Sequence, residues 1–258
     1  MLFPDIDPVA LTVGGWPVRW YGLMYLAGIW GGWLWARRQY CRFPSLSQSD
    51  VDDFIPWLIA GIIVGGRLGY VLFYDPLYFV AHPLDIVKTW QGGMSFHGGV
   101  MGVGCALGLY GVRRNILISS FSDNLVLCVP VGLFFGRIGN LINQEVCGRM
   151  ADVLWAVIFP RVDIFPRHPS QIYEALLEGL LLFVILNTAA PTLARKPWAL
   201  SALFLVGYGT ARFVCELYRL PDHVYHMGWF SLTQGQLLSL PMICGGGFLL
   251  WWQLRRRS

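Results

Sequence analysis

The chain has 258 residues, of which 55% are hydrophobic and 13% are charged. Soluble globular domains contain about 25% charged residues, so this chain has roughly half the usual supply for a water-exposed surface. This composition excludes a soluble globular protein, a disordered chain, a coiled coil and a nucleic-acid-binding domain, and the formal net charge of +4 is modest. It indicates a helical protein that crosses a membrane several times.

Seven apolar stretches match the length that a bilayer core requires, which is about 20 mainly apolar residues per helix. In chain order they are residues 18–35, 54–73, 96–110, 125–142, 173–187, 200–218 and 237–254, of which the third and fifth need their flanks to span. Glycines within them suit close contacts between helices in lipid. We therefore predict an all-α integral membrane protein in which residues 1–258 form one domain, a single bundle of seven transmembrane helices.

Lys and Arg residues are distributed unevenly over the connections between these stretches. One alternating set of connections carries Arg37, Arg38, Arg42, Arg113, Arg114, Arg195, Lys196, Arg255, Arg256 and Arg257. The opposite set carries Arg19, Lys88, Arg149, Arg161, Arg167 and Arg219. Cytoplasmic loops are enriched in Lys and Arg. The larger first set therefore predicts a cytoplasmic C-terminus and an N-terminus outside.

Three segments outside the spans have a mixed character. Residues 1–11 contain Asp5 and Asp7 and no basic start, so they do not resemble a cleavable signal peptide and are expected to lie at the membrane interface. Residues 74–93 combine aromatic and charged residues and are also expected to be interfacial. The longest outer connection, residues 145–172, is predicted to form a small cap.

The fourth stretch carries polar residues toward its end. Arg137, Asn140 and Gln144 are spaced i, i+3 and i+7, which places them on one face of a helix. Ionisable residues inside a membrane are costly unless they are paired or line a wet cavity. This face is therefore a candidate functional site.

The sixth stretch carries a second polar stripe, formed by Tyr208, Arg212, Glu216 and Arg219. A structural ion pair between Arg212 and Glu216 explains one such stripe equally well. Two arginine-bearing stripes on separate helices favour a phosphate site, because guanidinium groups bind phosphate oxygens in a bidentate manner.

A third polar cluster surrounds His97, which is followed by Gly98 and Gly99 and preceded by Gly92 and Gly93. Glycine pairs let the backbone approach a ligand closely. A helix N-terminus favours the neutral imidazole, which can act as a general base. A histidine that only caps the helix is the alternative. Tyr21 in the first stretch is either a site residue or an ordinary interfacial tyrosine.

Metal-binding patterns are weak in this chain. His223 and His226 are three residues apart but flank no carboxylate cluster, and the six cysteines show no CxxC spacing. We therefore predict no metal and no cofactor.

The segment Gly136-Arg137-Ile138-Gly139-Asn140, followed by Asn143-Gln144-Glu145-Val146-Cys147-Gly148, resembles the signature of the bacterial prolipoprotein diacylglyceryl transferases. Further blocks that resemble this family, in order, are residues 20–25, 65–70, 92–99 and 168–174, and Arg212 with Glu216 and Arg219. The chain departs from the family pattern at Leu141 and Cys147, and its segment between Gly148 and His168 is short.

The resemblance implies an enzyme that moves the diacylglyceryl group of phosphatidylglycerol onto a cysteine thiol of a prolipoprotein signal peptide, forming a thioether and releasing glycerol phosphate. It implies catalytic roles for Tyr21, His97, Arg137 and Arg212. It implies substrate binding by Arg137, Asn140, Glu145, Gly148, Glu216, Arg219, Gly98 and Gly99. In this interpretation His97 is the base, aided by Tyr21, and Arg137 and Arg212 clamp the phosphodiester.

The partners implied are phosphatidylglycerol, a prolipoprotein signal peptide with its lipobox cysteine, and membrane lipid, without nucleic acid. We expect a monomer in the bacterial cytoplasmic (inner) membrane, with its active site toward the outer side. The alternative is a multi-span secondary transporter with an anion or phosphate site. Against it are the absence of an inverted repeat and the clustering of polar residues toward the outer half.

Overall fold

A computed structural model of the chain describes residues 1–221, 223–227 and 230–255. Arg256 and Arg257, which the charge analysis places on the cytoplasmic side, lie outside the described residues. The chain divides into two compact units, and each is described by itself. The first comprises Met1–Ala36 with Asp123–Ser258, and the second comprises Arg37–Ser122.

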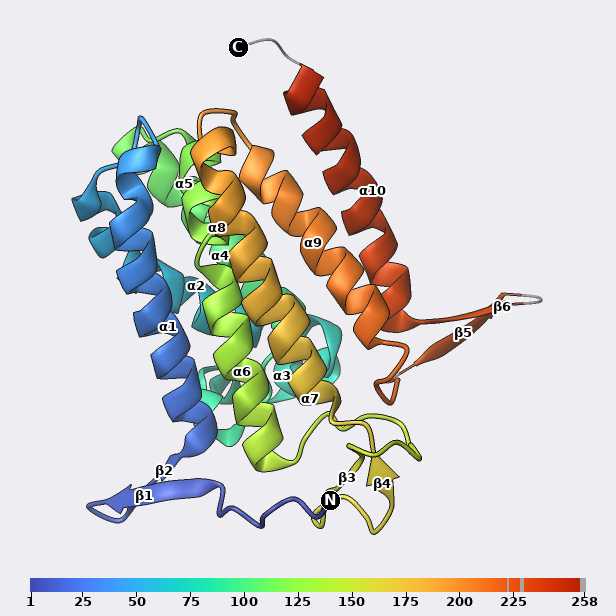
Figure 1. Cartoon of the computed structure of the whole chain (residues 1–258). Helices are drawn as coiled ribbons and strands as arrows, with labels where there is room; N and C mark the ends of the chain where they lie inside the picture. The colour runs from blue at the N-terminus through green and yellow to red at the C-terminus, as the bar shows by residue number, and fades with distance from the viewer. Residues whose placement is uncertain (222, 228–229, 256–258) are drawn as a thin grey trace. The chain divides into compact units, whose positions relative to one another are not determined.

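The first unit is built mainly from long helices (Figure 1). They are α1 (Trp20–Gln39), α5 (Ile118–Val126), α6 (Val129–Asn143), α7 (Ser170–Glu174), a π-helical stretch (Ala175–Leu181), α8 (Leu182–Leu193), α9 (Ala199–Cys215) and α10 (Gln234–Arg255). The last residues of α1 and the first residues of α5 belong to the second unit. The helix α9 packs against both α8 and α10, and α6 packs against α7 and the π-helical stretch. These contacts bring the polar ends of α6, α7 and α9 together.

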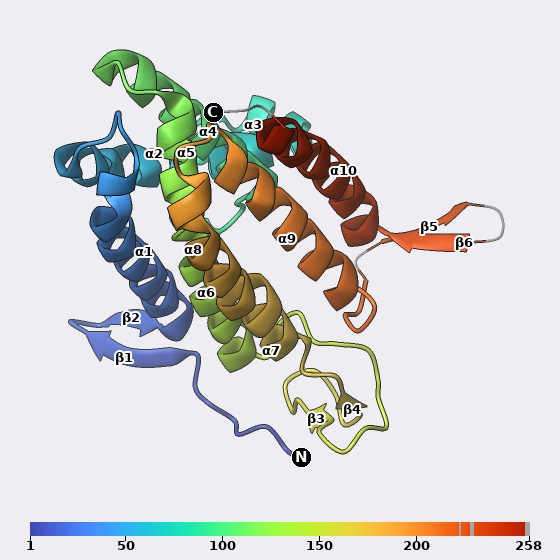
Figure 2. The same cartoon turned by 45° about the horizontal axis from the view of Figure 1, so that its top comes forward.

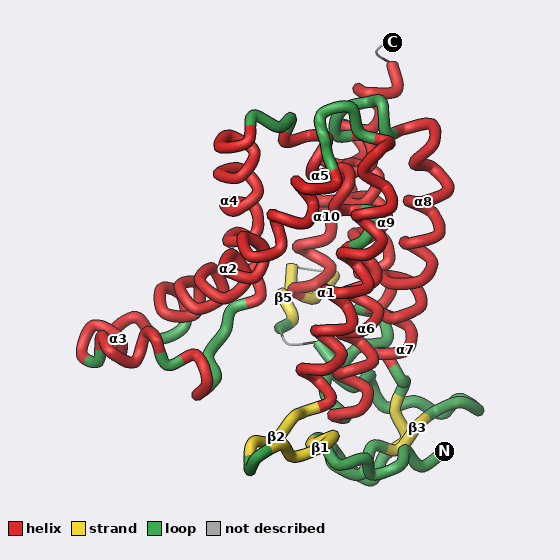
Figure 3. Tube along the Cα trace, turned by 90° about the vertical axis from the view of Figure 1, so that its left-hand side faces the viewer, coloured by secondary structure: helices red, strands yellow, loops and turns green. Residues whose placement is uncertain are grey.

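Three short antiparallel hairpins complete this unit. They pair β1 (Val9–Val13) with β2 (Trp16–Arg19), β3 (Val157–Ile158) with β4 (Pro166–Arg167), and β5 (Val224–Met227) with β6 (Phe230–Thr233). Strands β1 to β4 lie at the end of the unit where α6 ends and α7 begins (Figure 3). The turn between β1 and β2 is formed by Gly14 and Gly15, both with positive φ, as a two-residue hairpin turn requires. These strands modify the prediction of an entirely helical chain.

The second unit contains α2 (Gln48–Phe73) and α4 (Phe96–Arg114), which pack closely against each other. Shorter elements join them, namely η1 (Tyr40–Arg42), α3 (Pro76–Ala81), η2 (Pro83–Val87), η3 (Thr89–Gln91) and the start of α5. The contact depends on glycine. A Cβ atom on Gly102 would collide with the Gly61 carbonyl oxygen and lie 2.8 Å from the Cα of Gly65. A Cβ on Gly98 would lie 2.8 Å from the Cα of Gly69. The backbones therefore touch without intervening side chains.

Each predicted apolar stretch overlaps a helix or consecutive helices for most of its length. Among the described residues, three helical segments are long and apolar enough to cross a membrane: Gln48–Phe73, Ser170–Leu193 and Gln234–Arg255. Ile118–Val126 and Val129–Asn143 pass this test as a pair, bent by 40° at the break between them. A mainly helical protein with several helices able to span a membrane is thus confirmed. The count of seven spans and the orientation of the termini stay predictions.

Asp123 caps α9 from a different part of the chain. Its side chain is buried, and its Oδ1 accepts hydrogen bonds from the Ser201 backbone N–H at 2.7 Å and from the Ser201 hydroxyl at 2.6 Å. The first N–H groups of a helix have no partner within the helix, and a carboxylate there also interacts favourably with the helix dipole. Asp123 therefore fixes the start of α9, which carries Arg212 at its other end.

We expect Asp123→Ala to lower the free energy of unfolding by about 1–2 kcal/mol, because α9 loses its capping acceptor. Ser201→Ala removes only the hydroxyl bond and should cost less, about 0.5–1 kcal/mol. Thermal unfolding in detergent micelles measures both values. Equal stability of Asp123→Ala and the wild type would refute the capping role.

Candidate functional site

Six charged side chains form an ion-pair network in the first unit. They come from α6, from α7 and the π-helical stretch, and from the C-terminal end of α9 with the turn that follows: Arg137, Glu174, Glu178, Arg212, Glu216 and Arg219. The two arginine stripes predicted on separate helices therefore converge. We call this group the charge cluster.

Glu174 is the residue that joins the three arginines. Its Oε2 lies 3.1 Å from Nε of Arg137, and its Oε1 accepts a hydrogen bond from Nη1 of Arg212 at 2.8 Å. The same Oε1 lies 4.0 Å from Nη1 of Arg219. Because one carboxylate contacts guanidinium groups from both stripes, it fixes the distance between them.

Glu178 and Glu216 complete the network. Arg137 donates from Nη2 to Glu178 Oε2 at 3.1 Å, and Nη1 of Arg212 lies 3.8 Å from Glu178 Oε1. Arg212 also donates from Nη2 to Glu216 Oε1. The same Glu216 oxygen lies 3.7 Å from Nη1 of Arg219. The structural ion pair considered from the sequence, Arg212 with Glu216, is therefore present, but as one part of a larger array.

The charges of the cluster balance, with three guanidinium groups and three carboxylates. The Glu174 and Glu178 side chains are 0% exposed, whereas those of Arg137 and Arg212 are 17% and 13% exposed. A buried cation without a partner is costly, and paired glutamates remove much of that cost. The buried glutamates thus hold both arginines, while a small part of each arginine side chain remains exposed.

The helix that carries both glutamates is irregular where they occur. The π-helical stretch Ala175–Leu181 follows α7 directly and includes Glu178. Single π-turns are rare in proteins overall, but those that occur often lie at functional sites. Gly179 allows close approach to α6, because a Cβ there would lie 2.8 Å from the Cβ of Phe134. Both features bring the two carboxylates within reach of Arg137.

Two predicted site residues meet where α6 ends: Asn140 lies in the last turn of α6, and Glu145 lies in the loop that follows. Asn140 donates from Nδ2 to Glu145 Oε2 at 3.4 Å, and Gln171 donates from Nε2 to the Glu145 carbonyl at 2.7 Å. The helix ends at Asn143, and Gln144 adopts a left-handed conformation with φ 59°. The predicted helical face therefore holds for Arg137 and Asn140 but not for Gln144, which lies beyond the last helical residue.

Gly148 occupies a position that admits no side chain. Its N–H donates to the His168 carbonyl at 3.1 Å, and a Cβ would lie 2.8 Å from the carbonyl oxygen of Tyr218. An isolated antiparallel bridge pairs Gly148 with Arg219. Gly148 thereby ties the loop between α6 and α7 to the segment that follows α9, next to the charge cluster.

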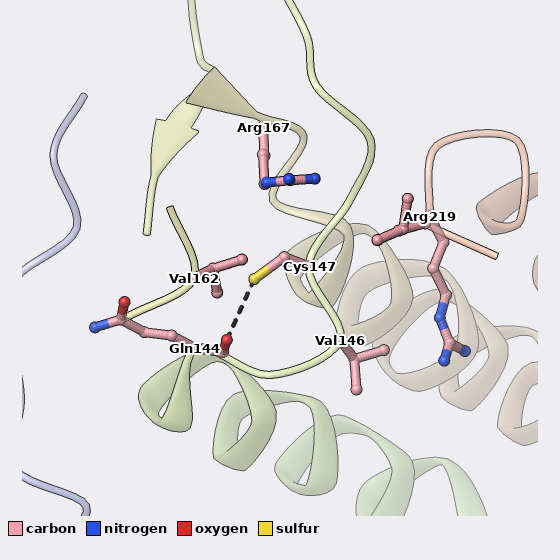
Figure 4. A pocket seen from close by; sticks show the side chains of 7 residues that line it. Gln144, Val146, Cys147, Val162, Arg167 and Arg219 are labelled. Carbon is pink, nitrogen blue, oxygen red and sulfur yellow. Dashed lines mark hydrogen bonds between the residues drawn. The ribbon is translucent and has the colours of Figure 1, made fainter. Parts of the chain in front are cut away.

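A cavity of about 290 Å³ lies beside this loop (Figure 4). The residues that line it are Gln144, Val146, Cys147, Val162, Arg167, Arg219 and Leu220. Arg167 donates to the Gly148 carbonyl at 3.0 Å and to the carboxylate of Asp163, and this pairing lowers the pKa of Asp163. Burial raises the pKa of the Cys147 thiol, which disfavours the nucleophilic thiolate. The chain's own Cys147 is therefore not a candidate nucleophile.

Tyr21 lies on α1 in the first unit, where a Cβ on Gly139 of α6 would approach its ring to 3.0 Å. The Tyr21 hydroxyl lies 3.2 Å from that of Tyr25, and the two rings are 4.9 Å apart. Tyr21 thus packs on α6 two residues beyond Arg137, and its described hydrogen-bond partner is Tyr25.

His97 belongs to the second unit and is exposed in the first turn of α4. The cap of this helix is Ser95, whose hydroxyl accepts from the Gly98 N–H at 3.2 Å. The alternative that His97 serves as the capping residue is therefore wrong. Gly98 is buried against the backbone of α2. Gly99 has more space, because a Cβ there would lie 3.8 Å from the nearest described atom, the Ile62 carbonyl oxygen.

Arg67 fixes the segment that leads to His97. Its guanidinium is buried and donates to four backbone carbonyls: Asp85 at 2.6 Å, Ile86 at 2.8 Å, Gly92 at 2.7 Å and Gly93 at 2.9 Å. All these groups belong to the second unit. A guanidinium satisfied by carbonyls closes this loop without a carboxylate partner.

No group of three or more His, Cys, Asp or Glu side chains within the described part of the chain is arranged to hold a metal ion. His226 lies on β5, and its Nδ1 is 2.8 Å from the Ser231 hydroxyl.

Glu174 and Glu178 are charged residues within a predicted span, where the chemistry was expected, but neither was assigned an individual role in the site from the sequence. Both are ionisable, lie one turn apart and fall in a predicted span, and that combination was the available signal. The pattern of their own helix did not reveal that their partners are Arg137 and Arg212.

The chain is similar to known proteins over almost its whole length. The family model described as prolipoprotein diacylglyceryl transferase matches residues 8–252. Relatives named phosphatidylglycerol–prolipoprotein diacylglyceryl transferase include that of Paramagnetospirillum magneticum, 46% identical over 99% of this chain and 97% of the relative. The relative from Rhodospirillum rubrum is 47% identical over 95% and 91%, and that from Pseudomonas putida is 48% identical over 99% and 97%. The chain belongs to the prolipoprotein diacylglyceryl transferase family.

Proposed function

We propose that this protein is a membrane enzyme that transfers the diacylglyceryl group of phosphatidylglycerol to the lipobox cysteine of prolipoproteins. The observation that carries the proposal is the charge cluster, in which Arg137 and Arg212 are held by the buried Glu174 within a chain of this family. A pair of fixed, partly accessible guanidinium groups suits a phosphodiester substrate.

In the proposed reaction, the cysteine sulfur attacks the carbon of the diacylglyceryl group that bears the phosphate ester. The new C–S bond forms as the C–O bond breaks, and the electron pair of that bond leaves with the oxygen of glycerol phosphate. The thiol proton passes to a base. Arg137 and Arg212 stabilise the negative charge on the departing phosphate. Because both are already held in place, they stabilise the transition state without having to rearrange during the reaction.

The guanidinium groups of the cluster would bind the monoanionic headgroup, and the paired glutamates lower the cost of keeping these cations in an apolar setting. The phosphodiester contacts Arg137 and Arg212, whose side chains are partly exposed, while Glu174 and Glu178 keep both groups in place. We assign Arg219 and Glu216 to the same headgroup site.

The remaining roles extend the assignments implied by the family resemblance. His97 accepts the thiol proton, aided by Tyr21, and Asn140 with Glu145 orients the headgroup or the arginines. Gly148 keeps the loop beside the cluster free of a side chain, and Gly98 and Gly99 shape the backbone next to His97. Exclusion of water by the surrounding helices protects the lipid from hydrolysis.

We further propose a single domain with seven spans, an outer N-terminus and a cytoplasmic C-terminus. The excess of Lys and Arg on one alternating set of connections supports this orientation. The site then faces the outer side of the bacterial inner membrane, with the hairpins near the end of α6 forming a small cap, and the enzyme acts as a monomer.

The function is tested with purified protein, phosphatidylglycerol vesicles and a synthetic lipobox peptide, read by mass spectrometry. We expect a diacylglyceryl mass gain on the peptide cysteine, none on a matched serine peptide, and none with phosphatidylethanolamine vesicles. An unchanged peptide mass would contradict the proposal. Phosphate uptake by sealed liposomes without lipid chemistry would favour the transporter.

His97→Gln is expected to lower turnover by about 100-fold, because the attacking thiol loses its proton acceptor. The glutamine preserves hydrogen bonding and approximate size, so the affinity for both substrates should change little. Thioether formation is measured across a pH series in membranes. Near-normal turnover at every pH would remove the base assignment and leave His97 a binding role.

A further inference from the structure

The charge cluster is connected to α10 through one buried hydroxyl. Thr233 is the last residue of β6 and is 5% exposed. Its Oγ1 donates to Glu216 Oε2 at 2.9 Å. The other oxygen of that carboxylate, Oε1, accepts from Nη2 of Arg212. The two oxygens of Glu216 are therefore divided between α10 and Arg212.

The direction of the Thr233 hydroxyl is fixed by a capping box at the start of α10. The Gln236 N–H donates to Thr233 Oγ1 at 3.2 Å, and the Thr233 N–H donates to Gln236 Oε1 at 3.1 Å. A hydroxyl has one proton to donate. Since Oγ1 accepts from Gln236, its proton is directed to Glu216.

Gly235 makes this approach possible. A Cβ at this position would overlap the Glu216 carboxylate and lie 2.7 Å from its Cγ. The first turn of α10 therefore lies directly against Glu216, and the positive end of the helix dipole favours the negative charge there. Strand β6 runs straight into this turn (Figures 1 and 2).

From these contacts we infer that Thr233 is a positioning residue for the proposed transfer reaction. It holds the Glu216 carboxylate in the orientation that aims Arg212 at the substrate phosphate. The inference rests on the proposed function. Arg212 occupies the last turn of α9, and Glu216 follows the helix, so neither is held by a continuous helical ladder on its C-terminal side. A small displacement of a positioned catalytic group has a large effect on rate, up to about 100-fold for 1 Å.

Four substitutions at Thr233 separate donation to Glu216 from capping of α10. Thr233→Ser retains both functions and Thr233→Val retains neither. Asn and Asp cap helices about equally well, but Asn can donate a proton to Glu216, whereas Asp has none to donate and adds a like charge beside it, so Thr233→Asn and Thr233→Asp compare the two cases at equal capping. Gln236→Ala weakens the capping box without removing the Glu216 contact.

The readouts are kcat and KM for lipid and peptide, with thermal unfolding in the same micelles. We expect Thr233→Ser within about twofold of the wild type, and Thr233→Val with kcat lowered about 10- to 100-fold and KM little changed. Thr233→Asp should be at least about tenfold slower than Thr233→Asn at similar unfolding temperature. Gln236→Ala should lower the unfolding temperature and leave kcat near normal.

Equal kcat values for Thr233→Asn and Thr233→Asp would overturn the inference. So would a Thr233→Val variant that matches Gln236→Ala in both kcat and unfolding temperature, because the hydroxyl would then only cap α10. If Thr233→Val does not fold, the Asn and Asp pair still decides. Failure of the proposed function is recognised separately, since the wild type would then transfer no diacylglyceryl group.

Discussion

Arg137→Ala is expected to lower diacylglyceryl transfer by about 1000-fold, the upper range for loss of one preorganised charge-stabilising group. Arg137 on α6 contacts both buried glutamates: its Nε lies 3.1 Å from Glu174, and its Nη2 lies 3.1 Å from Glu178. Its removal takes away a cation at the phosphate and leaves two buried carboxylates with less compensation. Initial rates with phosphatidylglycerol vesicles and a lipobox peptide measure the effect.

Arg137→Lys and Arg161→Ala are the controls for this prediction. Lysine keeps the charge but has no planar fork for two simultaneous contacts, so we expect about a 100-fold loss. Arg161 lies in the loop between β3 and β4 and pairs with Asp5 of the N-terminal segment at 2.6 Å, and its replacement should leave turnover near normal. Arg137→Ala with folded yield and turnover close to those of the wild type would refute the phosphate clamp.

Gly102→Ala is expected to lower the free energy of unfolding of the second unit by about 3 kcal/mol, a large value for one methyl group. The new Cβ would collide with the Gly61 carbonyl and lie 2.8 Å from the Cα of Gly65. Backbone atoms cannot rotate away as a side chain can, so α2 and α4 must separate. Unfolding in detergent micelles, followed by helical circular dichroism, measures the change.

Gly104→Ala on the same helix is the matched control. A Cβ there would meet no described atom within 4 Å, and alanine is favoured over glycine in a helix by about 1 kcal/mol. We expect this variant to be as stable as the wild type or more stable. If both alanine variants unfold at the same temperature, the close contact between α2 and α4 does not limit stability.

The helical content of this chain could be predicted well from its sequence, because an apolar run of sufficient length is a strong local signal. The hairpin around Gly14 and Gly15 was missed, because β1 and β2 are short and mostly exposed, and the end of β2 lies within the apolar stretch 18–35. The predicted stretch 125–142 ends close to the observed last residue of α6, Asn143, but the predicted helical face was extended too far, to Gln144. Gln144 continues the helical spacing in the sequence but adopts a left-handed backbone that ends the helix.

The site residues divide in a similar way. Arg137 and Arg212 could be predicted because charges inside apolar stretches are conspicuous, and the motif around Arg137 is specific. The roles of Glu174 and Thr233 depend on contacts between helices distant in sequence, which periodicity within one helix does not contain. The spacing around His97 left its capping role open, because Ser95 and His97 both lie near the start of α4.

The π-helical stretch Ala175–Leu181 has a consequence for how this helix tolerates changes in length. A π-turn contains one residue more than the α-turn it replaces. Deleting one residue from this stretch would allow a regular, apolar helix, so membrane insertion would be preserved. It would also rotate the part of the helix that contains Gln171 and Glu174 by about 100° relative to α8. A deletion that is silent for insertion would thus turn the shared carboxylate away from its arginines, and the extra residue acts as a spacer that sets the phase of the helix.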